Sequence, residues 1–363
     1  MKHDALIVLA WIATLCCPAL LHGQDGRVLL PDQPGVWRST YKSSPGTPKA
    51  NAAELATLRT ALAAIEQVVH ATPMLTAPRG FDVHAWQRLD RGCPSNPVLC
   101  RQAPLAGWIR FDFEGYESRN GKVMTMSSAV DQDPPNVDVA FNDPEATYVL
   151  HEAGNPEPTD PSGNKIVGPL IEIERVGDVV IYDNGVVILG RNPRPFFVPA
   201  TREDYLRDIV KQLAKTRNPD ASRAGRPDAI EQLFIDELAA LSPEQRQSQA
   251  YTHADSPTSS RLVPASREGA TPLNKFNPAY FDPALPRTAI QLITVRFTNL
   301  EDVRAHLRER PDLLERKPIT PERLAFLVES GLSVAWYRTF EAARQLDYSA
   351  LAALLAAPAP LAR

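Results

Sequence analysis

The sequence is poor in cysteine, in basic charge and in long hydrophobic runs. Of its 363 residues 4 are cysteine, and two of these lie within the first 17 residues, so a zinc site elsewhere would need ligands of another kind. Lys and Arg total 39 against 43 for Asp and Glu, a formal net charge of -4, which leaves no basic field to attract nucleic acid. Beyond the N-terminus no uncharged run approaches the roughly 20 residues that a membrane-spanning helix needs.

Common catalytic signatures are also lacking. The segment GYESRNGK, residues 115–122, has five residues between its glycines, whereas a phosphate-binding loop has four, and a hairpin turn explains it better. The segment HEAGNPE places Asn155 where the second histidine of an H-E-x-x-H zinc motif would stand. The G-x-S-x-G elbow of serine hydrolases does not occur. The sequence therefore does not identify an activity.

The chain does contain many hydrophobic residues and an unusual amount of proline. Hydrophobic residues make up 44% of the chain, and 34 of 363 residues are proline. Proline fixes φ and interrupts helices and strands, so we expect short elements joined by many turns. The length allows one large domain or two modest ones, with a sizeable core.

The first 23 residues have the layout of a secretory signal peptide. Lys2 precedes an uncharged run over residues 5–17, and the small residue Gly23 follows. Such a segment is cleaved on export, which predicts a mature chain that begins near Gln24, is secreted or periplasmic, and has no membrane span. A retained membrane anchor and a lipid anchor are the alternatives.

The mature chain would keep one pair of cysteines, Cys93 and Cys100, in the segment RGCPSNPVLC. An exported chain folds where thiols oxidise, and prolines bend the short loop between them, so we expect a disulfide. Closing so short a loop stabilises a fold by about 2 to 3 kcal/mol. The spacing differs from the C-x-x-C of metal knuckles and redox motifs, which makes a functional thiol pair the alternative.

Periodicity predicts an α+β fold: a mostly antiparallel sheet packed with helices, and a helical C-terminal half. Five regions are expected: the signal peptide (1–23), an irregular leader (24–50), an α+β domain with a helix, the sheet and two following helices (51–251), a polar loop or linker (252–275), and a strand with helices (276–363). The last region joins the same domain if its strand, within AIQLITVRF, enters the earlier sheet.

Local signals locate the main elements. Asn51 and Glu54 form a capping box before an amphipathic helix that ends before Pro73, and Thr201 caps another helix. The segment WIRFDFEGY alternates apolar and polar residues, as a strand with one dry face does, and an Asn-Gly turn follows it. The segment VVIYDNGVVIL is the clearest hairpin. Further helices are expected to open at positions 299 and 320.

Two pairs of residues are candidates for catalysis. His151 and Glu152 place an imidazole beside a carboxylate at the end of an expected strand, although adjacent strand residues point to opposite faces. Glu172 and Glu174 are separated by the strand period, so the spacing puts both carboxylates on one face, as general acid and base catalysis in glycoside hydrolysis requires. Like charges on a solvated face explain the second pair equally well.

Three further groups carry weaker signals. An acidic turn with three aspartates could hold calcium but lacks the pattern of an EF-hand loop; a polar loop has the residue types of a nucleophilic triad; and four tryptophans could line a sugar-binding groove or belong to the core. These groups are Asp131, Asp133 and Asp138; His253, Asp255 and Ser256; and Trp37, Trp86, Trp108 and Trp336.

The expected function is that of an exported, non-enzymatic binding or interaction module with an unknown envelope or extracellular ligand. The alternative is a secreted hydrolase that uses dispersed carboxylates or His151. No cofactor, metal or nucleic acid is expected. A deep pocket containing the candidate acids would favour the enzyme, and a shallow surface would favour the binder.

Overall fold

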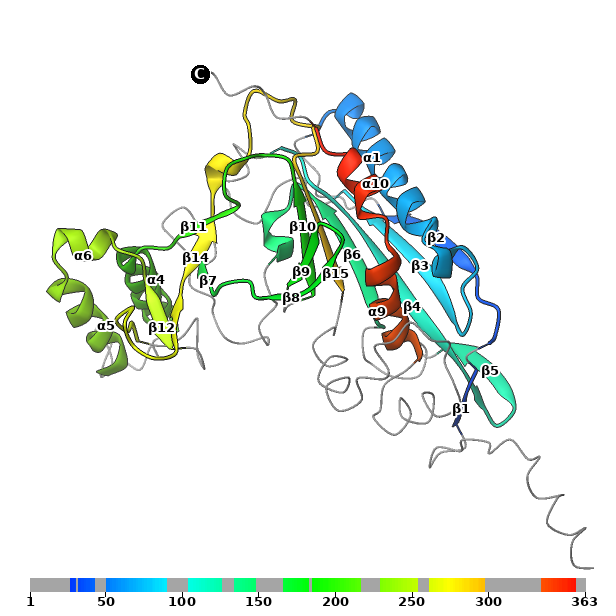
Figure 1. Cartoon of the computed structure of the whole chain (residues 1–363), viewed down its shortest axis with the longest axis horizontal. Helices are drawn as coiled ribbons and strands as arrows, with labels where there is room; N and C mark the ends of the chain where they lie inside the picture. The colour runs from blue at the N-terminus through cyan, green and yellow to red at the C-terminus, as the bar shows by residue number, and fades with distance from the viewer. Residues whose placement is uncertain are drawn as a thin grey trace, which may run out of the picture.

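The structure is a computed structural model that describes residues 27–30, 32–42, 50–89, 104–125, 134–147, 166–182, 185–216, 229–253, 261–297 and 334–356. These residues form an α+β fold with helices packed on a mixed sheet, so the predicted class is confirmed (Figure 1). The expected signal peptide lies outside the described residues. A helical C-terminal half is not supported, because strands and helices alternate in the described residues after position 185.

A ten-stranded sheet forms the centre of the fold. In spatial order its strands are β2 (Trp37–Lys42), β3 (Phe81–Arg88), β4 (Gly107–Arg119), β6 (Asn136–Phe141), β15 (Leu292–Phe297), β10 (Val186–Gly190), β9 (Val179–Tyr182) and β8 (Glu172–Val176), while β1 (Arg27–Leu29) and β5 (Lys122–Thr125) pair with β4. β2 and β3 are parallel, and the other neighbours are antiparallel. The sheet is therefore mostly antiparallel, as predicted.

The longest strand, β4, follows the alternation in its sequence. Ile109, Phe111 and Phe113 are fully buried, and the residues between them are half-buried. Asn120 and Gly121 then have φ values of 52° and 77°, the left-handed conformation that a two-residue hairpin turn needs. β4 and β5 accordingly pair, and so do β9 and β10, which confirms both predicted hairpins.

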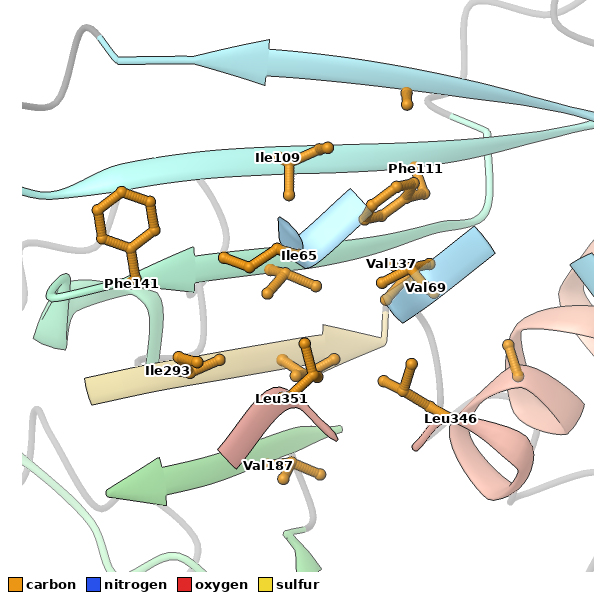
Figure 2. Close-up of a cluster of buried hydrophobic side chains, with 14 of the residues drawn as sticks. Ile65, Val69, Ile109, Phe111, Val137, Phe141, Val187, Ile293, Leu346 and Leu351 are labelled. Atoms are coloured by element: carbon orange, nitrogen blue, oxygen red, sulfur yellow. The ribbon is translucent and has the colours of Figure 1, made fainter. Parts of the chain in front are cut away.

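Four helices cover one face of the sheet: α1 (Ala52–His70), α2 (Pro73–Thr76), α9 (Val334–Gln345) and α10 (Tyr348–Ala353) (Figure 1). The predicted capping box at Asn51 starts α1, and its apolar stripe faces the strands. Figure 2 shows Ile65 and Val69 of α1 gathered with Phe111 of β4 and with Leu351 of α10 in one buried cluster. We call the opposite side of the sheet, turned away from these helices, the outer face.

Most of a second lobe is inserted between β10 and β15, which are neighbours in the main sheet (Figure 1). It contains three helices, a three-stranded sheet and a two-stranded pair. Its elements are α4 (Arg202–Thr216), α5 (Ala229–Ala240), α6 (Pro243–Gln247), β11 (Phe197–Pro199), β14 (Asn274–Phe276), β7 (Ile166–Val167), β12 (Tyr251–His253) and β13 (Ala270–Pro272). Strand β7, which precedes β8 in the chain, joins this lobe by pairing with β14. Helix α4 begins after Thr201, whose hydroxyl accepts a hydrogen bond from the Asp204 backbone N–H at 3.0 Å, as predicted.

Two expected regions differ from the structure. The leader 24–50 is not wholly irregular, because β1 and β2 lie in it and join the main sheet. The polar region 252–275 contains β13 and the start of β14, so its described part is structured. These strands are short and half-polar, and pairing with distant strands stabilises them rather than their own periodicity. The strand within AIQLITVRF is β15, which lies at the centre of the earlier sheet.

Asn142, directly after β6, joins the central strands from within the core. It is fully buried with φ 56°. Its Nδ2 donates to the carbonyl oxygens of Leu105 and Ala289, both at 2.9 Å. Its Oδ1 accepts from the backbone N–H groups of Gln291 at 2.8 Å and Leu292 at 3.3 Å. One side chain thus aligns the ends of β4, β6 and β15.

Candidate functional site

Cross-strand register places a row of polar side chains on the outer face. Trp86 of β3 is opposite Arg110 of β4, Arg110 is opposite Asp138 of β6, and Asp138 is opposite Arg296 of β15. Directly opposite residues share a face, and so do residues two apart on one strand. We call the resulting set of six residues the Trp–Arg–Asp face: Trp86, Trp108, Arg110, Asp112, Asp138 and Arg296.

Two ion pairs lie at the centre of this face. Arg110 Nε is 2.6 Å from Asp112 Oδ1, and the two side chains are 21% and 13% exposed. Arg296 contacts Asp138, with side chains 27% and 6% exposed. Charges this shielded from water interact more strongly than surface pairs do. The pairs therefore hold the planar guanidinium and carboxylate groups in place before any ligand arrives.

Asp112 is held in a mixed environment. Burial raises the pKa of its carboxyl above the ordinary value; the Arg110 guanidinium and a hydrogen bond from Trp86 oppose the rise, and the charge of Asp138 adds to it. The net direction is upward. The negative charge of Asp138, on the neighbouring strand, therefore disfavours ionisation of Asp112. Carboxyl groups whose pKa is shifted by burial and by a nearby like charge are common at functional sites.

Within the described residues, one carboxylate oxygen of Asp138 accepts no hydrogen bond. The residue is 5% exposed. Its Oδ2 accepts a hydrogen bond from the Arg296 guanidinium, whereas Oδ1 is buried and accepts no hydrogen bond within the described part of the chain. A buried acceptor left unpaired costs about 1 to 3 kcal/mol, and more when it is charged. Such a group in a folded protein requires an explanation.

The aromatic residues of this face are fixed by neighbours. The rings of Trp86 and His84 lie 3.8 Å apart between centroids, and the Thr40 hydroxyl is 3.0 Å from His84 Nε2. The guanidinium of Arg88 lies over the Trp108 ring, 5.7 Å from its centroid. Both tryptophans are half-buried, and Arg88 is exposed. The face therefore carries rigid aromatic groups with a charged rim.

Two boundaries limit this face. At the β3 side, Asp82 is 1% exposed and accepts hydrogen bonds from the Val36 N–H at 2.8 Å, from Arg38 at 2.8 Å and from Tyr116. Burial, together with the hydrogen bond to Asp82, raises the pKa of Tyr116 to about 12. At the β10 side, an aromatic cluster of the second lobe packs on Leu292 of β15. The polar region is thus enclosed on both sides.

Glu172 and Glu174 do not form a shared site. A register shift in β8 places Glu172 opposite Tyr182 and Glu174 opposite Ile181, and consecutive residues of β9 point to opposite faces. The expectation of one common face is therefore wrong, because a bulge interrupts the alternation. Glu172 pairs with Arg175 at 2.6 Å, and Glu174 pairs with Arg344 of α9 at 2.8 Å.

Several other candidates lie outside the described residues. They are His151, Glu152, Cys93, Cys100, Asp131, Asp133, Asp255 and Ser256. His253 lies in β12 of the second lobe. Trp37 packs on the helix side, with its ring 4.6 Å from His70 and its Nε1 donating to Glu66 at 3.1 Å. Among the candidate tryptophans whose side chains the structure describes, Trp86 and Trp108 are thus brought together on the outer face.

The importance of Arg110, Asp112 and Arg296 was missed in the sequence. The signal was present in the polar positions of WIRFDFEGY and ITVRF, which alternate with buried residues. An ordinary solvated strand face favours Thr, with Lys used at exposed edges. Tryptophan and arginine together on one polar face instead indicate a binding surface.

No group of three or more His, Cys, Asp or Glu suited to a metal ion occurs within the described ranges. Among the described helices, none is both long and apolar enough to cross a membrane. Comparison of the chain with protein-family models, with curated proteins and with solved structures finds no match.

Proposed function

We propose that this protein is an exported, non-enzymatic binding module and that the Trp–Arg–Asp face is its binding surface. The observation that carries the proposal is the composition of this face: two half-buried tryptophans and two shielded arginine–aspartate pairs near the centre of a wide sheet. Tryptophan and arginine dominate the energetics of binding surfaces. Rigid aromatic groups also lose little conformational entropy when a ligand binds.

Export is supported by the sequence of the first 23 residues and by the single remaining cysteine pair. The protein would then work in the periplasm or outside the cell. N-terminal sequencing of the exported product is expected to begin near Gln24. A product that still begins at Met1 would contradict export without affecting the assignment of the binding surface.

A retention assay tests the binding surface. Purified mature protein is immobilised and incubated with solubilised envelope material from the producing cells. Trp108→Ala is expected to reduce retention of the bound material at least tenfold. Arg207→Ala, on α4 with a side chain 58% exposed, is the matched control and should retain as much as the unaltered protein. Equal retention by both variants would refute the face as the site.

A secreted hydrolase is the second candidate, and one observation favours it. Asp112 has a raised pKa and lies near a second carboxylate, that of Asp138, and glycoside hydrolysis uses two carboxyl groups of which one, the general acid, has a raised pKa. His151 remains a candidate base for the same reaction. Release of reducing sugar from envelope polysaccharide, abolished by Asp112→Asn, would favour the hydrolase over the binding module.

A further inference from the structure

The unpaired oxygen of Asp138 defines what a ligand must supply. Oδ1 lies in the floor of the Trp–Arg–Asp face, on a side chain 6% exposed. A ligand group that reaches it must be small and must donate a hydrogen bond, because the acceptor is nearly closed off from water. A hydroxyl group or a protonated amine meets both conditions.

The charges around this oxygen discriminate between the two. Asp138 is opposite Arg110 on one neighbouring strand and opposite Arg296 on the other. Two guanidinium groups beside the acceptor disfavour a cationic ligand, and Asp112 and Asp138 disfavour an anionic one. The formal charges of the two arginines and two aspartates cancel, and the exposed Arg88 beside Trp108 adds one positive charge at the rim. The electrostatics therefore favour a neutral ligand with hydroxyl donors.

The tryptophans add a second requirement. Trp86 and Trp108 lie diagonally across β3 and β4, because Trp86 is opposite Arg110 and Trp108 is opposite Arg88. Their rings offer apolar faces bordered by hydrogen-bonding groups. A matching ligand presents apolar C–H surfaces and hydroxyl groups alternately. A sugar ring has this character: its axial hydrogens form an apolar face, and its hydroxyl groups project around the edge.

The width of the face indicates a chain rather than a single sugar. It extends over four adjacent strands, from β3 through β4 and β6 to β15, which at about 4.8 Å between strands corresponds to about 15 Å. From the proposed binding function, on which this step depends, we infer that the ligand is a neutral oligosaccharide or polysaccharide and that Asp138 Oδ1 accepts a hydrogen bond from one of its hydroxyl groups.

Direct titration tests this inference with defined probes. The probes are hexasaccharides of β-1,4-glucose, α-1,4-glucose and β-1,4-N-acetylglucosamine, with hexagalacturonate as the acidic comparison. Isothermal titration calorimetry and tryptophan fluorescence are expected to show saturable binding of at least one neutral probe. Trp86→Ala, Trp108→Ala and Asp138→Asn should each weaken it at least tenfold, while Arg207→Ala should leave it unchanged. Circular dichroism and the unfolding midpoint establish that each variant is folded.

The envelope material retained by the immobilised protein supplies the second arm. Periodate, which cleaves vicinal diols, should abolish its retention, and proteinase K should not. Retention that depends on Trp108 but is lost after proteinase K, with no neutral probe bound, would overturn the saccharide and leave the binding surface in place. Binding of hexagalacturonate alone would also overturn it. If neither retention nor titration depends on this face, the binding function itself fails.

Discussion

Replacing Asn142 tests how the central strands are aligned. Asn142→Ala removes two donated and two accepted hydrogen bonds from a fully buried position. At about 1 kcal/mol each, these account for roughly 4 kcal/mol. Alanine would also occupy the left-handed conformation at φ 56°, which costs a further ~1 kcal/mol. A loss of about 5 kcal/mol is comparable to the whole stability of many domains.

The measurement is equilibrium unfolding in urea, followed by circular dichroism and by tryptophan fluorescence. Asn142→Gly retains the backbone conformation without strain, so it should be about 1 kcal/mol more stable than Asn142→Ala. Asn120→Ala, at an exposed turn with φ 52°, is the control for the conformation alone and should cost about 1 kcal/mol. A loss below about 1 kcal/mol for Asn142→Ala, at an unchanged m-value, would refute the alignment role.

Three further predictions concern other parts of the chain. A Cβ at Gly190 would lie 1.6 Å from the Tyr280 hydroxyl oxygen, so Gly190→Ala should loosen the packing of the second lobe and expose the connection between β10 and β11 to limited proteolysis; an unaltered digestion pattern would contradict this. Burial alone would raise the pKa of Asp204, but hydrogen bonds from Lys275 and Thr201 outweigh it and hold the pKa below its ordinary value. The stability that Asp204 contributes is therefore present above pH ~4 and is lost as the pH falls through the lowered pKa, and Asp204→Asn should flatten the acid limb of a plot of stability against pH; an unchanged acid limb would count against the pairing. Thiol titration of the denatured, non-reduced mature protein should find no free thiol, and two reactive thiols would rule out the predicted disulfide.

Local sequence signals were sufficient for individual elements. The capping box at Asn51, the N-cap at Thr201 and the turn at Asn120 each act within a few residues of the chain, and each one lies where it was predicted. The alternation in β4 likewise assigned its dry face correctly. These signals reflect steric and hydrogen-bonding preferences of neighbouring residues, which do not depend on the rest of the fold.

Partners from distant parts of the chain were not predictable in this way. Glu172 and Glu174 fit the strand period, yet a bulge separated them onto two faces. The short strands β1 and β2 lack a strong pattern of their own. They form because β1 pairs with β4 and β2 pairs with β3. Trp86 and Arg296 belong to one face because β3 pairs with β4, β4 with β6, and β6 with β15.

By itself the sequence determined the class of the fold, the positions of most helices and hairpins, and which side of each main strand is dry, because apolar spacing and caps are local properties. Tertiary structure alone decided the strand order, the insertion of the second lobe and the assembly of two tryptophans with two arginine–aspartate pairs. The physical reason is that strand pairing joins segments far apart in the chain, and its register, rather than any one segment, sets which side chains meet.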